Sequence, residues 1–172
     1  MNIILEQAGI QENEKKRLTK LYGYNIIENL DKTGTFQHIV SMAARIFNVP
    51  IALVSFVDEM NVVAQSNIEM EGAGEFSRDI SLCSMAILKN EVTVFENARE
   101  EPCLLTNPLV YGSFGLQFYA GAPLTTPDGF NIGVLAVVDK KPRAFSKDEE
   151  AMLEGLAAIV MEELEERLSV GC

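Results

Sequence analysis

The chain has 172 residues, 48% of them hydrophobic, and a formal net charge of -11 from 14 Lys and Arg against 25 Asp and Glu. This length predicts one domain, and the apolar content excludes an intrinsically disordered chain. The acidic balance excludes nucleic acid as the main partner, because Lys and Arg supply the affinity for phosphates. No apolar run reaches the ~18 residues that a membrane span needs, so no membrane partner is expected.

Cysteine usage and the first residues indicate the compartment. Cys83, Cys103 and Cys172 are too few and too scattered for a disulfide framework, and no CxxC pair predicts a zinc site. The first residues lack the basic and long apolar segments of a secretory signal. We therefore expect a reduced, cytoplasmic protein.

The first half of the chain predicts two helices, two strands and a loop, over 12–30, 36–47, 51–57, 62–66 and 67–77. Gly23 weakens the first helix. Thr33 or Thr35 is the expected N-cap of the second helix, and Pro50 ends it. The strands are β-branched runs, whereas the loop is polar and contains glycines.

The second half predicts a short helix, three strands and a long helix, over 79–89, 92–95, 116–124, 132–138 and 146–168. In the short helix the residues expected to face inward are Ile80, Cys83, Ile87 and Leu88. The irregular segment 98–115 is long enough to indicate a function. Ser146 and Glu149 form a capping box, and an apolar stripe runs from Leu153 to Leu168, whose far end is expected to pack against a second subunit.

This order of elements predicts an α+β fold. We expect a mainly antiparallel sheet of five or six strands, with the N- and C-terminal helices packed on one face. The short helix and the irregular segment are left to cover the other face.

Several segments together resemble the GAF domain family, a family of small-molecule sensors. They are NVPIALVSFVDE, ISLCSMAIL, NPLVYGSFGLQFYAGAPL and DGFNIGVLAVVDKKPRAFS, followed by the closing helix. The resemblance covers about residues 15–168, so we expect one GAF domain there, with tails at 1–14 and 169–172. It is close to the GAF domains of bacterial signalling histidine kinases, but here the domain is expected to stand alone. The resemblance implies a GAF/PAS-like sheet with a ligand pocket on the face away from the terminal helices.

The resemblance also implies which residues bind the ligand: Ser81, Cys83, Ser84, Asn107, Tyr111, Phe118 and Tyr119. Ser84 follows the cysteine where bilin-binding relatives carry His, which argues against a covalent tetrapyrrole. Met85 replaces a His that is usual in the histidine-kinase subgroup. We therefore expect no cofactor, and a small ligand that binds without a covalent bond.

A second family motif, typical of phosphodiesterase GAF domains, is partly present as Asp139-Lys140, Phe145 and Glu149-Glu150. In that family the Lys and the acidic residue form an ion pair beneath the pocket, so the resemblance implies a pair between Lys140 and Glu149. Asp139 stands where the motif has Asn, and this change leaves cyclic-nucleotide binding unsupported.

Catalytic chemistry has little support in the sequence. A helix N-terminus and Arg78 would lower the pKa of the Cys83 thiol, but free cysteine usually behaves as a buried small hydrophobe. A Cys83–Cys103 pair is what an enzyme similar to free methionine sulfoxide reductase would need. His38, the one histidine, is a surface or boundary residue without the partners of a metal site or a catalytic triad. We expect neither catalytic nor metal-binding residues.

Three hypotheses remain. The first is a non-catalytic signalling module that binds a small molecule or a signalling protein and forms a homodimer through its terminal helices. The second is the thiol enzyme, and the third is a structural dimerisation domain whose pocket is filled by side chains such as Met85, Phe114 and Phe118. A cavity of about 300 Å³ or more over the sheet would favour the first hypothesis over the third.

Overall fold

A computed structural model describes residues 3–26, 36–67, 75–77, 81–112 and 114–170. Its helices are α1 (Ile3–Gly23), α3 (Gln37–Ile46), α4 (Leu82–Ala86), α5 (Pro108–Tyr111) and α6 (Lys147–Val170), with short 3-10 helices η1 (Ala98–Glu100) and η2 (Pro102–Leu104). The strands are β1 (Ile51–Val57), β2 (Asn61–Ser66), β3 (Glu75–Ser77), β4 (Thr93–Phe95), β5 (Phe118–Thr125) and β6 (Asn131–Asp139). Within these ranges no helix has the length and apolar character of a membrane span.

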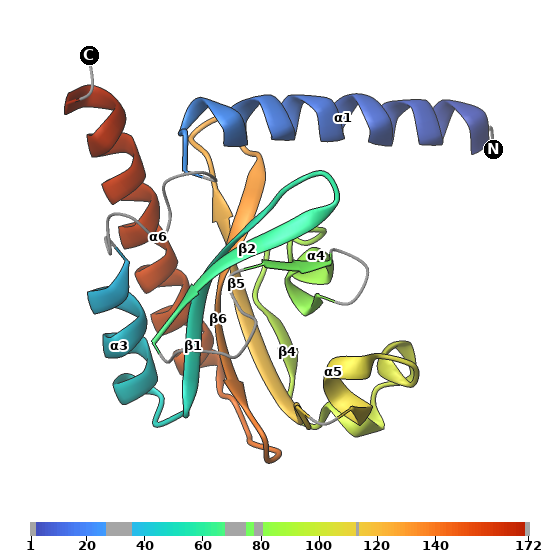
Figure 1. The fold of residues 1–172 in the computed structure, drawn as a ribbon, viewed down its shortest axis with the longest axis vertical. Coiled ribbons are helices and arrows are strands. Elements are labelled where there is room, and N and C mark those ends of the chain that lie inside the picture. Colours follow the sequence, from blue (N-terminus) through green and yellow to red (C-terminus); the bar gives the residue numbers. More distant parts are fainter. Residues whose placement is uncertain (1–2, 27–35, 68–74, 78–80, 113, 171–172) are drawn as a thin grey trace.

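The six strands form one sheet in the order β3-β2-β1-β6-β5-β4, and every neighbouring pair is antiparallel. Helices α3 and α6 cover one face, and α4 and α5 lie on the other side (Figure 1). Two separate apolar cores result, one between the sheet and α3 and α6, the other between the sheet and α4 and the segment 98–116. The predicted α+β architecture is therefore confirmed, with six strands.

Helix α1 crosses one end of the sheet, and its N-terminal half projects beyond it (Figure 1). The buried guanidinium of Arg17 anchors the helix, because its Nη1 donates to the carbonyl oxygen of Val57 at 2.7 Å. Arg17 also pairs with Glu14 at 2.8 Å. The helix begins at Ile3, so most of the expected tail at 1–14 is helical.

Several local predictions differ from the structure. Leu88 was expected to face inward, but it follows the end of α4 and is 79% exposed. Part of the predicted loop forms β3, which pairs with β2. Phe36 occupies the N-cap of α3 and makes no side-chain cap bond. Thr33, Thr35 and Ile80 lie outside the described residues.

The capping box at the start of α6 is confirmed. The Glu149 amide donates to Ser146 Oγ at 3.2 Å, and the Ser146 amide donates to Glu149 Oε1 at 3.0 Å. The apolar stripe is buried from Leu153 to Leu164 in the chain's own core. These side chains are thus not available to a second subunit, and nothing is described of the Leu168 side chain.

The predicted ion pair between Lys140 and Glu149 is wrong. Glu149 is used by the capping box, and Lys140 Nζ lies 4.9 Å from the centre of the Phe114 ring. Arg143 takes the structural role instead: its guanidinium bonds to Asp139 at 3.1 Å and to the carbonyl oxygens of Phe47 and Asn48 at 2.8 and 2.6 Å. One side chain therefore ties the end of β6 to the C-terminal end of α3.

Candidate functional site

An apolar cavity of about 70 Å³, partly open to solvent, lies over the sheet face that α3 and α6 leave uncovered. Strands β1, β2, β5 and β6 form its floor, and its roof is formed by α4 together with Leu109, Phe114 and Leu116. Its described lining residues are Ile51, Leu53, Val62, Ala64, Ser81, Leu82, Cys83, Leu109, Phe114, Leu116, Tyr119 and Val138. No charged residue is among them, so the cavity favours uncharged contents.

The polar groups of the cavity gather around Cys83. Ser81 is the N-cap of α4, and its Oγ accepts from the Cys83 amide at 3.2 Å. The Tyr119 hydroxyl donates to Cys83 Sγ, also at 3.2 Å. A Cβ on Gly121 would lie 2.6 Å from that hydroxyl, so a glycine there leaves room for the tyrosine. The fold thus places a thiol and a phenol within hydrogen-bond distance of each other in the otherwise apolar lining of the cavity.

Burial sets the ionisation of this pair. Cys83 is 4% exposed, and desolvation raises the pKa of its thiol, only partly offset by hydrogen bonds from neighbouring hydroxyls. Desolvation also raises the pKa of Tyr119 well above its usual value. Both groups therefore stay neutral at neutral pH, and a neutral thiol is a poor nucleophile.

Three of the predicted site residues line the cavity: Ser81, Cys83 and Tyr119. Asn107 instead caps α5, where its Oδ1 accepts from the Leu109 amide at 2.9 Å. Tyr111 is 48% exposed and donates its hydroxyl to the carbonyl of Arg99. Ser84 is half-buried and is not among the described lining residues.

The prediction that Phe118 lines the pocket is wrong. Successive side chains of a strand point to opposite faces, so Phe118 and its neighbour Tyr119 on β5 cannot share one face. Phe118 belongs to the core under α6, where its ring lies 5.6 Å from that of Phe145. It does not fill the cavity, whereas Phe114 does line it and Met85 packs against the same core.

Sequence reasoning missed most of the apolar lining. Ile51 and Leu53 alternate on β1, and this period of two was a usable signal for the cavity-facing side. Leu109, Phe114 and Leu116 come from the irregular segment, where no periodicity marks the inward side. Their bulk reduces the cavity to about 70 Å³, below the roughly 300 Å³ of common ligand pockets, so its volume does not favour a ligand of ordinary size over a filled pocket.

The other candidate groups lie apart from the cavity. Cys103 is exposed on η2, while Cys83 is buried. The side chain of His38 is 63% exposed, as predicted for a surface residue, and its Nε2 lies 3.4 Å from Glu163. Among the described residues no cluster of His, Cys, Asp and Glu has the arrangement of a metal site.

The burial of Cys83 predicts slow thiol chemistry. In a Cys172→Ser variant, Ellman's reagent at pH 8 is expected to label Cys103 rapidly and Cys83 only as fast as the protein unfolds. A rapid second label in the folded protein would contradict this prediction, and Cys103→Ser is the control that should abolish the fast phase.

The raised pKa of the Cys83 thiol also affects the stability of the fold. The stability contributed by Cys83 is complete below its ordinary pKa of about 8.5 and is lost as the pH rises above it.

Comparison with known proteins matches residues 31–164 to the GAF domain model. The cyclic di-GMP phosphodiesterase PA2567 of Pseudomonas aeruginosa is 38% identical over 127 residues, which are 73% of this chain and 22% of that protein. The chain thus spans about a fifth of the length of this curated relative.

Solved structures share the fold at low identity. The GAF domain of an Acinetobacter phosphoenolpyruvate-protein phosphotransferase superposes with a TM-score of 0.63 at 19% identity, covering 91% of this chain and 97% of that one. The type II free methionine-R-sulfoxide reductase of Thermoplasma acidophilum gives 0.63 at 21% identity, covering 77% and 92%. The matched family model, the curated relative and the shared fold place this chain in the GAF domain family, as a signalling module.

Proposed function

We propose that this GAF domain is a non-catalytic sensor that holds a small uncharged ligand in the cavity over its sheet and acts as a homodimer. The observation that carries the proposal is the cavity itself, which is apolar, is partly open to solvent and lies against Cys83 and Tyr119. The neutral thiol supports a binding role for Cys83 over the nucleophile that the thiol-enzyme hypothesis needs.

The size of the cavity selects the ligand. A volume of about 70 Å³ is roughly half of the ~150 Å³ that accommodates benzene in an engineered apolar cavity. The ligand we propose is therefore smaller than an aromatic ring, carries no charge, and has at most one polar atom to meet the Tyr119 hydroxyl. Cyclic di-GMP, a large dianion, is expected not to enter, and we assign no phosphodiesterase activity to this chain.

The fold provides a route by which such a ligand alters the helices. Tyr119 touches the cavity, and the adjacent Phe118 packs on Phe145 just before α6. The same Phe145 ring lies 5.4 Å from Phe47 at the end of α3. A ligand that favours one position of Tyr119 would shift β5 and, through these rings, the start of α6, which is the population shift that a sensor needs.

The ligand proposal is tested with xenon as a small apolar probe. Xenon under pressure is expected to shift the methyl NMR signals of Leu53, Leu109 and Leu116, and benzene is expected to leave them unchanged. In Leu109→Ala the enlarged cavity should accept benzene, which should raise the melting temperature of that variant. Leu105→Ala, at a leucine that is 61% exposed, is the matched control and should gain nothing from benzene. If xenon shifts no cavity methyl, the pocket is filled and the structural-domain hypothesis takes its place.

Exposed apolar side chains on α3 and α6 support self-association. They are Met42, Ile46, Met152 and Ile159, each about 40–50% exposed. The two helices run antiparallel, because His38 meets Glu163 and Phe47 meets Phe145. Met42, one turn after His38, is therefore expected beside Ile159, one turn before Glu163. We propose that this α3/α6 face, rather than the buried stripe, joins two copies.

Ile159→Glu is expected to convert a dimer into a monomer, because a carboxylate would be buried without a partner at the interface. Light scattering after size exclusion measures the mass. The control is Leu105→Glu, an exposed leucine on the opposite side of the sheet, which should leave the mass unchanged. A monomeric unsubstituted protein at 100 μM would refute the dimer.

A further inference from the structure

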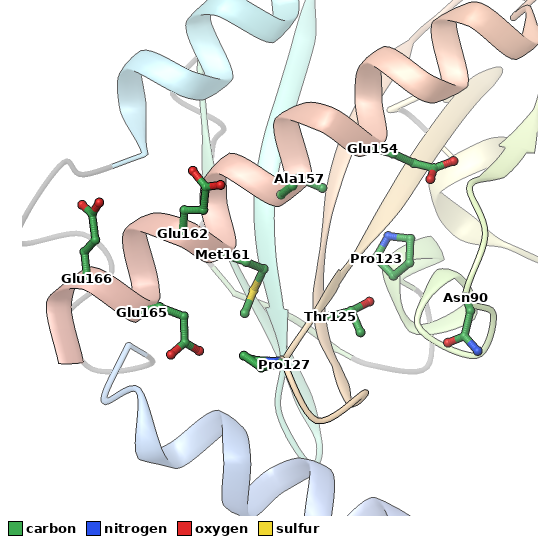
Figure 2. A pocket seen from close by; sticks show the side chains of 11 residues that line it. Asn90, Pro123, Thr125, Pro127, Glu154, Ala157, Met161, Glu162, Glu165 and Glu166 are labelled. Carbon is green, nitrogen blue, oxygen red and sulfur yellow. The ribbon is translucent and has the colours of Figure 1, made fainter. Parts of the chain in front are cut away.

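A second hollow lies between α6 and the end of β5, with a volume of about 630 Å³. Figure 2 shows Met161 and Glu165 extending from α6 toward Pro127 and Thr125, with Asn90 and Pro123 farther along the same wall. This α6/β5 groove is separate from the cavity at Cys83, since the two share no described lining residue.

The groove combines an apolar floor with an acidic border. Its floor contains Pro123, Pro127, Ala157 and Met161, none of them charged. Four of its lining residues are glutamates of α6: Glu154, Glu162, Glu165 and Glu166. No Lys or Arg is among its described lining residues, and the whole chain carries a net charge of -11. The charge of this surface therefore complements a cationic partner.

The dimensions of the groove suit a helix. Its α6 wall runs from Glu154 to Glu166, a length of about 18 Å at 1.5 Å per residue. Ala157 and Ala158 are the small residues of this wall, and small side chains permit the 8–10 Å approach of packed helices. An amphipathic helix binds in such a groove through apolar anchors spaced at three and four residues.

The local ion pairs leave this acidic character in place. Lys20, on α1 beside the turn, pairs with Asp128 at 2.5 Å, and the Tyr24 hydroxyl bonds to Glu165. The first contact joins α1 to the turn after Pro127, and the second joins the residue after α1 to Glu165 at the border of the groove. Neither brings a positive charge onto Glu154 at the other end.

We propose that the α6/β5 groove docks a basic amphipathic helix of a partner protein, with apolar side chains on the floor and Lys or Arg toward the glutamates. The site lies on α6, the helix that moves in the proposed sensor mechanism. A helix bound there would therefore contact the element whose position changes when a ligand binds, and this step rests on the proposed function.

The test uses a fluorescent peptide of Leu and Lys, about 18 residues long, with Leu at helical spacing. Anisotropy is expected to show saturable binding that weakens as salt rises. Ala158→Arg, which puts bulk and positive charge into the groove, should weaken binding by at least about tenfold. Ala151→Arg is the matched control on the same helix outside the groove; it changes the net charge equally and should weaken binding by less than about twofold.

Three outcomes would overturn the proposal. Equal losses in the two variants would mean that the peptide is attracted only by the overall charge. Equal binding of a peptide with Glu in place of Lys, or with the same residues in scrambled order, would mean that binding depends neither on positive charge nor on the helical spacing of the leucines. A change of mass in Ala158→Arg by light scattering, without a change in peptide binding, would mean that a second copy covers the groove. Circular dichroism of each variant verifies that it is folded.

Discussion

Replacing Gly133 with alanine is expected to lower the free energy of unfolding by more than about 4 kcal/mol. Gly133 lies in β6, the central strand, opposite Phe56 on one side and Leu124 on the other. A Cβ there would lie 2.0 Å from the carbonyl oxygen of Ser55 and 3.0 Å from its carbon. Both contacts are with backbone, so no side chain can rotate to relieve them. The β1 and β6 strands would have to separate where they pair.

The measurement is urea denaturation followed by circular dichroism. Gly155→Ala is the control, since a Cβ at Gly155 would meet nothing within 4 Å. Its helical position on α6 predicts a gain of about 0.5–1 kcal/mol, because alanine loses less conformational freedom than glycine in a helix. A loss below about 1 kcal/mol in Gly133→Ala would show that the sheet relaxes around the methyl group, contrary to this account.

Arg143→Ala is expected to cost about 3 kcal/mol. Asp139 is 5% exposed, and its carboxylate would lose its ion-pair partner. The carbonyl oxygens of Phe47 and Asn48, at the end of α3, would lose their donor. The guanidinium also lies 5.9 Å from the centre of the Phe118 ring. The Asp139 carboxylate is buried and the Phe47 bond is partly buried, so water replaces the arginine poorly at these two groups, whereas the bond to Asn48 is exposed.

Two further variants separate charge from geometry. Arg143→Lys keeps the charge but lacks the planar fork that reaches several acceptors at once, so it should recover less than half of the loss. Arg45→Ala, at an exposed arginine of α3, should change stability by less than about 0.5 kcal/mol. Full recovery by lysine would mean that the charge alone, and not the bonds to the carbonyl oxygens, stabilises the fold.

The sequence was a reliable guide where the signal is local. The run of β-branched and aromatic residues from Ile51 to Val57 forms a strand with the predicted bounds, because such residues favour strands and a turn follows them. The Ser146 and Glu149 capping box needs only residues three apart, and both of its bonds form. The resemblance in the FYAGAPL and IGVLAVVD segments led to the correct family, and these segments form β5 and β6, which pair with each other over eight positions.

The site was harder to predict because it depends on which side a residue faces and on distant contacts. Phe118 and Tyr119 are adjacent and both aromatic, and composition alone does not reveal which one faces the cavity. Arg143 lies 96 residues from Phe47, whose carbonyl oxygen it binds, so no local pattern indicates the bond. Leu88 shows the converse, since its apolar character suggested burial but the helix ends before it.

The central strand has a consequence for how binding can be measured. All nine residues of β6 are buried, and the strand is paired on both sides, with β1 and with β5. Its amide hydrogens therefore exchange with solvent only when the whole domain unfolds. Any molecule that binds the folded state slows that exchange in proportion to its occupancy, whether it enters the cavity or the groove. Deuterium uptake by the peptide that contains β6 thus serves as an affinity scale for ligands that have not yet been identified.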